Sequence, residues 1–123
     1  MSEPKKLLIV DDEETLTFTL YQAFIKAPFE CEVVTASSGE EALGRIEDAS
    51  FDLVITDLAM PGIDGLELLN SIKLHSPKTR VIIITGFGSD EREEKAYEMG
   101  ADQYIEKPFD IHELRESVFK LLE

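Results

Sequence analysis

The stretch DLVITDLAMPGIDGLELL (residues 52–69) contains, in order, a short aliphatic run, an aspartate, a loop and the start of a helix. Its first part, DLVIT (52–56), has the aliphatic and β-branched residues of a buried strand. Pro61 and the glycines beside it are typical of a turn. Leucine and isoleucine then recur from Leu68 to Ile72 at helical spacing. The stretch therefore predicts one unit of strand, loop and helix.

The same alternation runs through the rest of the chain. Further short apolar runs are KLLIV (6–10), CEVVTA (31–36), RVIII (80–84) and QYI (103–105). Helical spacing is found in Leu16, Leu20 and Phe24; in Ala42, Leu43 and Ile46; in Ala96 and Met99; and in Ile111, Leu114, Val118 and Leu121. Strands that are apolar on both faces and joined through helices indicate a parallel sheet with helices on both sides. The predicted fold class is a doubly wound α/β sandwich with five strands and five helices.

Local signals support several of the helix ends. Ser38 with Glu41, and Asp110 with Glu113, have the spacing of a capping box, in which side chains satisfy the free amides of a first helical turn. Gly100 suits the left-handed residue that follows the end of a helix. We therefore expect helices to begin near residues 39 and 111 and to end near residue 99.

Composition restricts the class of protein. The 123 residues are expected to form one domain, 1–123, and 26 acidic against 12 basic residues give a formal charge of −14. That charge argues against direct nucleic-acid binding and favours divalent cations or basic partner surfaces. Cys31 is the single cysteine, so no internal disulfide is expected, and the sequence shows neither a signal peptide nor an apolar run of the ~20 residues that cross a membrane. These features predict a cytoplasmic protein without a membrane partner.

Polar residues follow four of the five predicted strands. Ligands of open α/β sheets bind beyond the carboxyl ends of the strands. Asp11, Asp12 and Asp57 place carboxylates there, Thr85 adds a hydroxyl and Lys107 adds an ammonium group. Mg²⁺ prefers oxygen ligands and is usually held by one or two carboxylates and a phosphate. We therefore expect the aspartates to hold Mg²⁺ while the hydroxyl and the ammonium group contact an anion.

The neighbouring acids have a simpler interpretation. Glu13 and Glu14 are expected in the first turn of a helix, where negative charge meets the positive end of the helix dipole. Asp11 and Asp12 could likewise be only a helix start. The other strand-end residues favour the metal site over that alternative.

Four motifs together resemble one known family. LLIVDDEE (7–14), VITDLAMPGIDGLELL (54–69), IIITG (82–86) and YIEKPF (104–109) occur in the order and at the spacing of response regulator receiver domains, the phosphoacceptor modules of two-component signalling. The resemblance extends over essentially the whole chain. It implies a flavodoxin-like sheet of strand order 2-1-3-4-5.

The resemblance also implies a role for individual residues. Asp57 resembles the aspartate that accepts a phosphoryl group from a histidine kinase or a histidine phosphotransfer protein. Asp12, Asp57 and the backbone carbonyl of Ala59 would ligate Mg²⁺, with Asp11 acting mainly through a bound water. Lys107, preceding a proline with an expected cis bond, would pair with the phosphoryl oxygens.

Signalling would follow from a change of conformation. In the family's pattern, Thr85 donates a hydrogen bond to the phosphoryl group and Tyr104 turns inward with it. The face formed by the fourth helix, the fifth strand and the fifth helix would then report the change, including through a homodimer on phosphorylation. The chain departs from the commonest pattern at Ala59, which is small and apolar, and at Phe87, which is bulky, and both flank the site.

Three alternatives belong to other classes. A phosphohydrolase of the haloacid dehalogenase type also uses an aspartyl phosphate, but it needs an Asp-x-Asp motif after the first strand, where this chain has DDEE (11–14). A flavodoxin-like cofactor domain needs a phosphate-binding loop rich in hydroxyl groups and glycine at the same place. A receiver fold that acts only through protein contacts would not need the acidic set.

Overall fold

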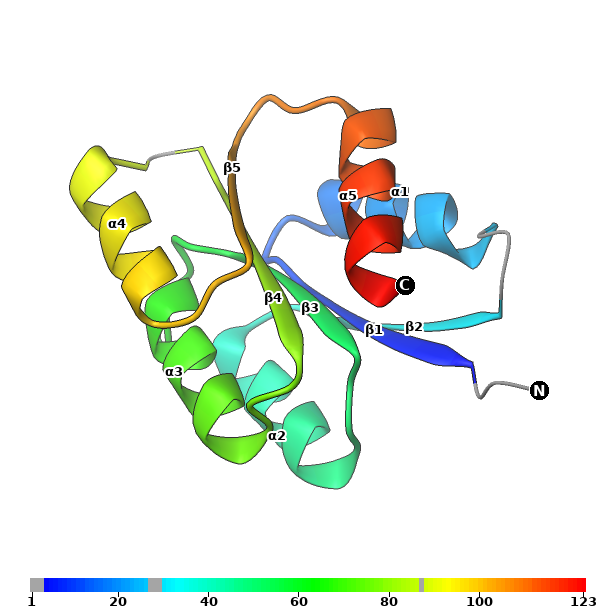
Figure 1. Cartoon of the computed structure of the whole chain (residues 1–123), viewed down its shortest axis with the longest axis horizontal. Coiled ribbons are helices and arrows are strands. Elements are labelled where there is room, and N and C mark those ends of the chain that lie inside the picture. Colours follow the sequence, from blue (N-terminus) through cyan, green and yellow to red (C-terminus); the bar gives the residue numbers. More distant parts are fainter. Residues whose placement is uncertain (1–3, 27–29, 87) are drawn as a thin grey trace.

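The computed structural model describes residues 4–26, 30–86 and 88–123. Its centre is a five-stranded parallel sheet of order β2-β1-β3-β4-β5 (Figure 1). The strands are β1 (Lys5–Val10), β2 (Cys31–Ala36), β3 (Leu53–Asp57), β4 (Arg80–Thr85) and β5 (Gln103–Glu106). The predicted fold class and strand order are confirmed.

Within the described residues, five helices cover the two faces of the sheet. They are α1 (Glu14–Ile25), α2 (Gly39–Asp48), α3 (Gly65–His75), α4 (Asp90–Glu98) and α5 (Ile111–Leu122). Helices α1 and α5 pack on one face, and α2, α3 and α4 on the other (Figure 1). Strands β1, β3 and β4 are buried on both faces, which explains their continuous aliphatic runs.

Two apolar cores result, one on each side of the sheet. On the side of α1 and α5, Phe24 is completely buried and its ring meets that of Phe119 edge to face, with ring centroids 6.2 Å apart. On the other side, Leu68, Leu69 and Ile72 of α3 pack under the sheet. Alternate residues of each central strand supply the two cores, so the sheet is fixed in register by burial on both faces.

The helix ends follow the expected chemistry with one exception. The side chains of Ser38 and Asp110 accept hydrogen bonds from the first-turn amides of α2 and α5, and Gly100 has a φ of 104° after α4. The prediction that Glu13 lies in the first turn of a helix was wrong, because α1 begins at Glu14 and Glu13 is its N-cap residue. Within the described ranges, no helix is long and apolar enough to cross a membrane.

Candidate functional site

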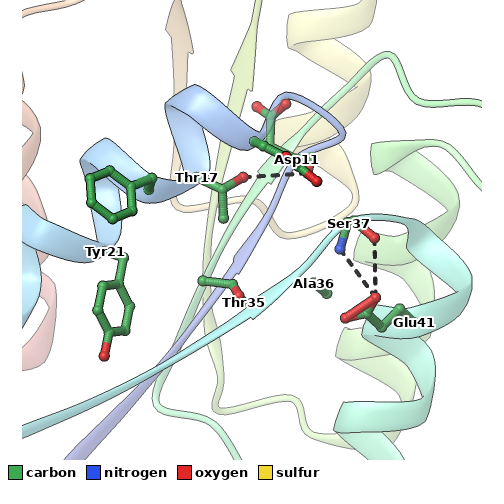
Figure 2. Close-up of a pocket in the computed structure, with 9 residues that line it drawn as sticks. Asp11, Thr17, Tyr21, Thr35, Ala36, Ser37 and Glu41 are labelled. Carbon is green, nitrogen blue, oxygen red and sulfur yellow. Dashed lines mark hydrogen bonds between the residues drawn. The ribbon is translucent and has the colours of Figure 1, made fainter.

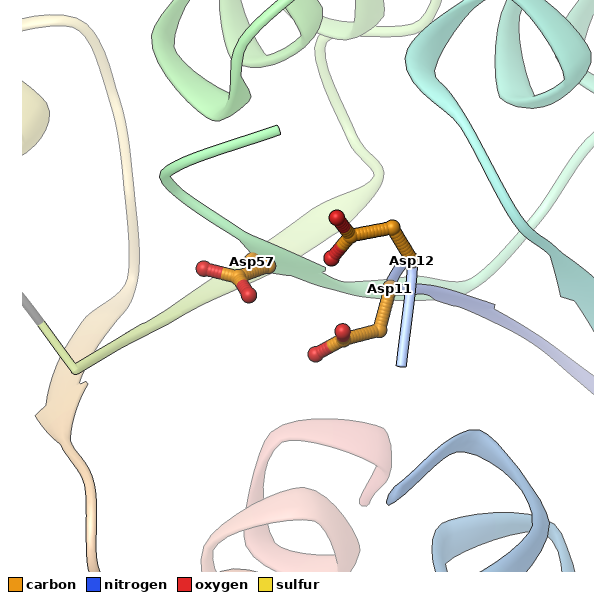
Figure 3. Close-up of side chains that lie close together, drawn as sticks. All are labelled: Asp11, Asp12 and Asp57. Carbon is orange, nitrogen blue, oxygen red and sulfur yellow. The ribbon is translucent and has the colours of Figure 1, made fainter. Parts of the chain in front are cut away.

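Three carboxylates converge at the carboxyl ends of the two central strands. β1 and β3 are adjacent, with Val10 opposite Thr56, so the next residue of each strand lies at the same edge of the sheet. Asp11, Asp12 and Asp57 each offer one carboxylate oxygen, and these oxygens lie within 4.8 Å of one another (Figure 3). Asp11 and Asp57 are buried, whereas Asp12 is exposed.

Lys107 brings a positive charge to the carboxylates. Its Nζ lies 3.1 Å from Oδ2 of Asp57, 3.4 Å from Oδ2 of Asp11 and 3.4 Å from Oε1 of Glu13. The backbone N–H of Lys107 donates a 2.8 Å hydrogen bond to the carbonyl of Thr85, which anchors the residue at the end of β4. The bond between Lys107 and Pro108 is cis, as the family resemblance implies.

The charges of this cluster are unbalanced. Burial raises the pKa of Asp11 to about 6, the nearby Asp57 adds to that effect, and a hydrogen bond from the Glu13 N–H and the charge of Lys107 oppose it. Burial disfavours the charged form of Lys107, but its hydrogen bond to Asp57 and the surrounding acids raise its pKa above the ordinary value. One ammonium group therefore faces more carboxylate charge than it can neutralise.

The donor set is suitable for a hard divalent cation. The cluster offers only oxygen ligands, two of its three carboxylates are buried, and additional positive charge would lower the raised pKa of Asp11. Mg²⁺ is usually bound by one or two carboxylates and retains several waters. Asp11, Asp12 and Asp57 are therefore the residues that could hold it.

The loop after β3 is fixed around Asp57. The backbone N–H of Ala59 donates a 3.1 Å hydrogen bond to Oδ1 of Asp57, so both carboxylate oxygens of Asp57 have partners. The Gly65 N–H donates to the Leu58 carbonyl, and a Cβ on Gly65 would overlap the carbonyl oxygen of Asp57. Farther along the loop, the Ile63 N–H donates to Oε1 of Glu40 at the start of α2.

Thr85 and Tyr104 lie on the neighbouring strands β4 and β5. Thr85 is fully buried at the end of β4, and Tyr104 is 8% exposed, with its side chain in the core beneath α4. A Cβ on Gly88 would overlap the hydroxyl of Tyr104 and come within 2.9 Å of Cγ2 of Thr85. The absence of a side chain at position 88 therefore makes room for the inward tyrosine.

A hollow of about 510 Å³ opens beside the carboxylates, between α1 and the start of α2 (Figure 2). Phe18 and Tyr21 form an apolar wall on α1, and Phe18 is 64% exposed. Glu41 lies on the opposite side, where its carboxylate accepts hydrogen bonds from the backbone N–H and the hydroxyl of Ser37. The hollow gives solvent access to the side of the site at Asp11.

The residues expected from sequence are mostly brought together. Asp11, Asp12, Asp57 and Lys107 form one cluster, and Ala59 joins it through its backbone. Phe87 lies outside the described residues. Sequence reasoning missed the contact between Glu13 and Lys107, although the position of Glu13 directly after Asp12 was a signal. It also assigned no role to Gly88.

Comparison with known proteins agrees with this geometry. The family model of the response regulator receiver domain matches residues 7–119. The chain belongs to this family. Receiver domains are the phosphorylated signalling domains of two-component response regulators, and the phosphoryl group is carried by an aspartate. Membership removes the support for the hydrolase and flavin-binding alternatives.

Individual relatives match over most of the chain. Sporulation initiation phosphotransferase F of Bacillus subtilis is 36% identical over 118 residues, which are 96% of this chain and 94% of that protein. The DNA-binding transcriptional regulator NtrC of Klebsiella pneumoniae is 39% identical over 105 residues, which are 85% of this chain and 22% of NtrC. This chain thus spans about a fifth of NtrC.

A solved structure gives the same result for the fold. The beryllofluoride-activated NtrC4 receiver domain dimer superimposes with a TM-score of 0.85 at 33% identity, covering 94% of each chain. The strand order and the arrangement of helices are therefore those of a receiver domain.

Proposed function

We propose that residues 1–123 form one Mg²⁺-dependent receiver domain that is phosphorylated on Asp57. The single observation that carries the proposal is the surroundings of this carboxylate. Asp57 ends the central strand, is buried, and contacts Lys107 and the Ala59 N–H while Asp11 and Asp12 stand beside it. The other two acids complete a cation site, and of the two buried carboxylates that contact Lys107, Asp57 has the shorter contact, 3.1 Å against 3.4 Å for Asp11.

The proposed donor is the phosphohistidine of a sensor histidine kinase or of a histidine phosphotransfer protein. An oxygen of the Asp57 carboxylate forms a bond to phosphorus while the bond from phosphorus to the histidine nitrogen breaks. The electron pair of the broken bond remains on the imidazole nitrogen. Hydrolysis later reverses the modification: water attacks phosphorus, the bond from phosphorus to Asp57 breaks, and phosphate leaves.

The protein's part in these steps is alignment and charge neutralisation. Lys107 pairs with the phosphoryl oxygens, and the Thr85 hydroxyl donates a hydrogen bond to them. When bound by Asp11, Asp12, Asp57 and the Ala59 carbonyl, Mg²⁺ supplies further positive charge for the phosphoryl oxygens. In this way the domain promotes its own phosphorylation and dephosphorylation without acting on another substrate.

The proposed output is a population shift at the face of α4, β5 and α5. Thr85 and Tyr104 lie on adjacent strands, and Tyr104 packs beneath α4, so a change at one residue is transmitted to the helix by contact. A solved relative carrying beryllofluoride is a dimer, which supports homodimerisation on phosphorylation. We propose that the domain works in the cytoplasm and that it does not itself bind nucleic acid, given its charge of −14.

The test is phosphorylation by acetyl phosphate, with and without Mg²⁺, followed by intact mass spectrometry. The wild type is expected to gain one acid-stable, base-labile phosphoryl group only when Mg²⁺ is present, and Asp57→Asn is expected to gain none. Asp48→Asn, an exposed change of the same kind at the end of α2, is the matched control and should behave like the wild type.

Two results would contradict the proposal. An adduct that persists in Asp57→Asn would assign the phosphoacceptor to another residue. No adduct on the wild type, from a donor that labels a control receiver domain, would favour a module that acts through protein contact alone.

A further inference from the structure

We propose that Glu13 is a positioning residue that holds Lys107 back from the phosphoryl group and thereby shortens the lifetime of phosphorylated Asp57. The inference rests on the proposed function and adds a residue that sets the rate at which the signal decays. It concerns the ion pair between Glu13 and Lys107, for which the phosphorylation chemistry has no need.

The ion pair has a defined geometry. Glu13 is the N-cap residue of α1, and its backbone N–H donates a 2.8 Å hydrogen bond to Oδ1 of Asp11. Its side chain makes no capping hydrogen bond and instead brings Oε1 within 3.4 Å of Nζ of Lys107. The backbone of Glu13 is therefore attached to the site, and its carboxylate faces the ammonium group.

Burial separates Glu13 from the other partners of Lys107. The side chains of Asp11 and Asp57 are 3% and 7% exposed, whereas that of Glu13 is 65% exposed. The two buried aspartates contact Lys107 from inside the site, and Glu13 attracts the same group from its solvent side. Lys107 thus has an exposed partner besides the two buried aspartates.

Phosphorylation makes this competition important. A phosphoryl group adds roughly two negative charges at Asp57, and these require the positive charge of Lys107. The Glu13 carboxylate competes for that charge and also repels the phosphoryl oxygens. Both effects favour loss of the phosphoryl group, so removal of the carboxylate should prolong its lifetime.

The experiment measures the decay of the phosphoryl adduct after acetyl phosphate is removed, in Mg²⁺ and at fixed ionic strength. Glu13→Gln is expected to lengthen the half-life about two- to fivefold, the range of a partly exposed ion pair. Glu14→Gln is the matched control. Glu14 is the next residue, is also exposed, and makes no ion pair with any residue in the described ranges, yet its substitution removes the same formal charge. Its half-life should equal that of the wild type.

A charge-conserving variant separates the ion pair from general electrostatics. Glu13→Asp keeps the negative charge but shortens the side chain by one methylene group, so the carboxylate no longer reaches Lys107. We expect a half-life closer to that of Glu13→Gln than to that of the wild type. A half-life at the wild-type value would mean that charge alone matters, and it would overturn the inference.

Failure of the inference can be told from failure of the proposed function. If the wild type forms the adduct and Glu13→Gln decays at the same rate, or if Glu14→Gln is prolonged equally, only the role of Glu13 is wrong. If the wild type forms no Mg²⁺-dependent adduct, the proposed function fails and the role of Glu13 fails with it.

Discussion

The hydroxyl oxygen of Tyr97 accepts a 3.1 Å hydrogen bond from the backbone N–H of Tyr104. Tyr104 lies on β5, at the edge of the sheet, and Tyr97 lies on α4 with 45% of its surface exposed. An edge strand has backbone groups without a partner strand. Here the Tyr97 side chain takes the place of a partner strand, so a hydrogen bond joins α4 to the edge strand β5.

Tyr97→Phe should loosen this connection while retaining the aromatic ring. The Tyr104 N–H loses its partner, at a cost of about 1 kcal/mol in the free energy of unfolding. Amide hydrogen exchange should show faster exchange at Tyr104. Tyr21→Phe, at a half-buried tyrosine of α1, is the control, and unchanged exchange at Tyr104 in both variants would contradict the prediction.

Gly88→Ala should displace the Tyr104 side chain, because a Cβ at that position overlaps the tyrosine hydroxyl. In protein labelled with 3-fluorotyrosine, the ¹⁹F signal of Tyr104 should move toward that of an exposed ring. Gly88→Ala should also lower the free energy of unfolding. The double variant Gly88→Ala/Tyr104→Phe lacks the overlapping hydroxyl oxygen and should recover part of that loss.

Gly44→Ala is the control for Gly88→Ala, and its effect on the free energy of unfolding should have the opposite sign. Gly44 is exposed within α2, and a Cβ there meets nothing within 4 Å. Its replacement should raise the free energy of unfolding by roughly 0.5–1 kcal/mol. A Gly88→Ala protein that is as stable as the wild type, with an unmoved ¹⁹F signal, would show that the loop yields instead of the tyrosine.

Asp11→Asn should change how the stability of the metal-free protein depends on pH. The folded-state pKa of Asp11 is about 6, above its ordinary value of 3.8, so the folded state holds the proton more tightly than the unfolded state. The contribution of Asp11 to stability therefore falls as the pH rises from about 4 to about 6. Above that range the cost reaches about 3 kcal/mol at most, by the usual conversion of a pKa difference.

Urea unfolding in a chelator at several pH values measures this effect. The stability of Asp11→Asn relative to the wild type should increase from pH 4 to pH 6 and then remain constant. Adding Mg²⁺ should reduce this gain in the relative stability of Asp11→Asn, because the cation favours the ionised form of Asp11 in the wild type. A difference independent of pH would mean that folding does not shift the pKa of Asp11.

Phe24→Ala should destabilise the protein by about 3–5 kcal/mol, since it removes a fully buried ring from the core between α1, α5 and the sheet. Phe18→Ala, on the same helix, removes a ring that is 64% exposed and should cost less than about 0.5 kcal/mol. Chemical denaturation of both variants tests the prediction. Equal losses of stability would contradict the burial of Phe24 and the exposure of Phe18 on α1.

Much of the fold was predictable because burial on both faces of a parallel sheet leaves a strong trace in the sequence. Residues 7–10 and 81–84 are aliphatic at every position, and the helices between the strands carry apolar residues on one side. The ends of β3 and β4 lie beyond the apolar runs that predicted them. Asp57 and Thr85 continue the ladder by one residue beyond the apolar runs, because backbone pairing does not depend on the polarity of the side chain.

The site was predictable where strand topology determines it. Asp11 and Asp57 follow adjacent strands, so their meeting requires only the sheet order. The contact of Glu13 with Lys107 depends instead on the side-chain conformation of an N-cap residue, and the role of Gly88 depends on where a tyrosine ring lies. Neither leaves a periodic pattern, since each arises from the packing of single side chains.

The strand order β2-β1-β3-β4-β5 also determines how firmly each part of the site is held. Asp57 stands on the middle strand, which is hydrogen-bonded on both sides, whereas Tyr104 stands on a strand of four residues with one neighbouring strand. Local opening should therefore cost less where the tyrosine lies than where the aspartate lies. The domain therefore combines a firmly held centre with a more loosely held border, and the border should open more often than the centre without unfolding the whole.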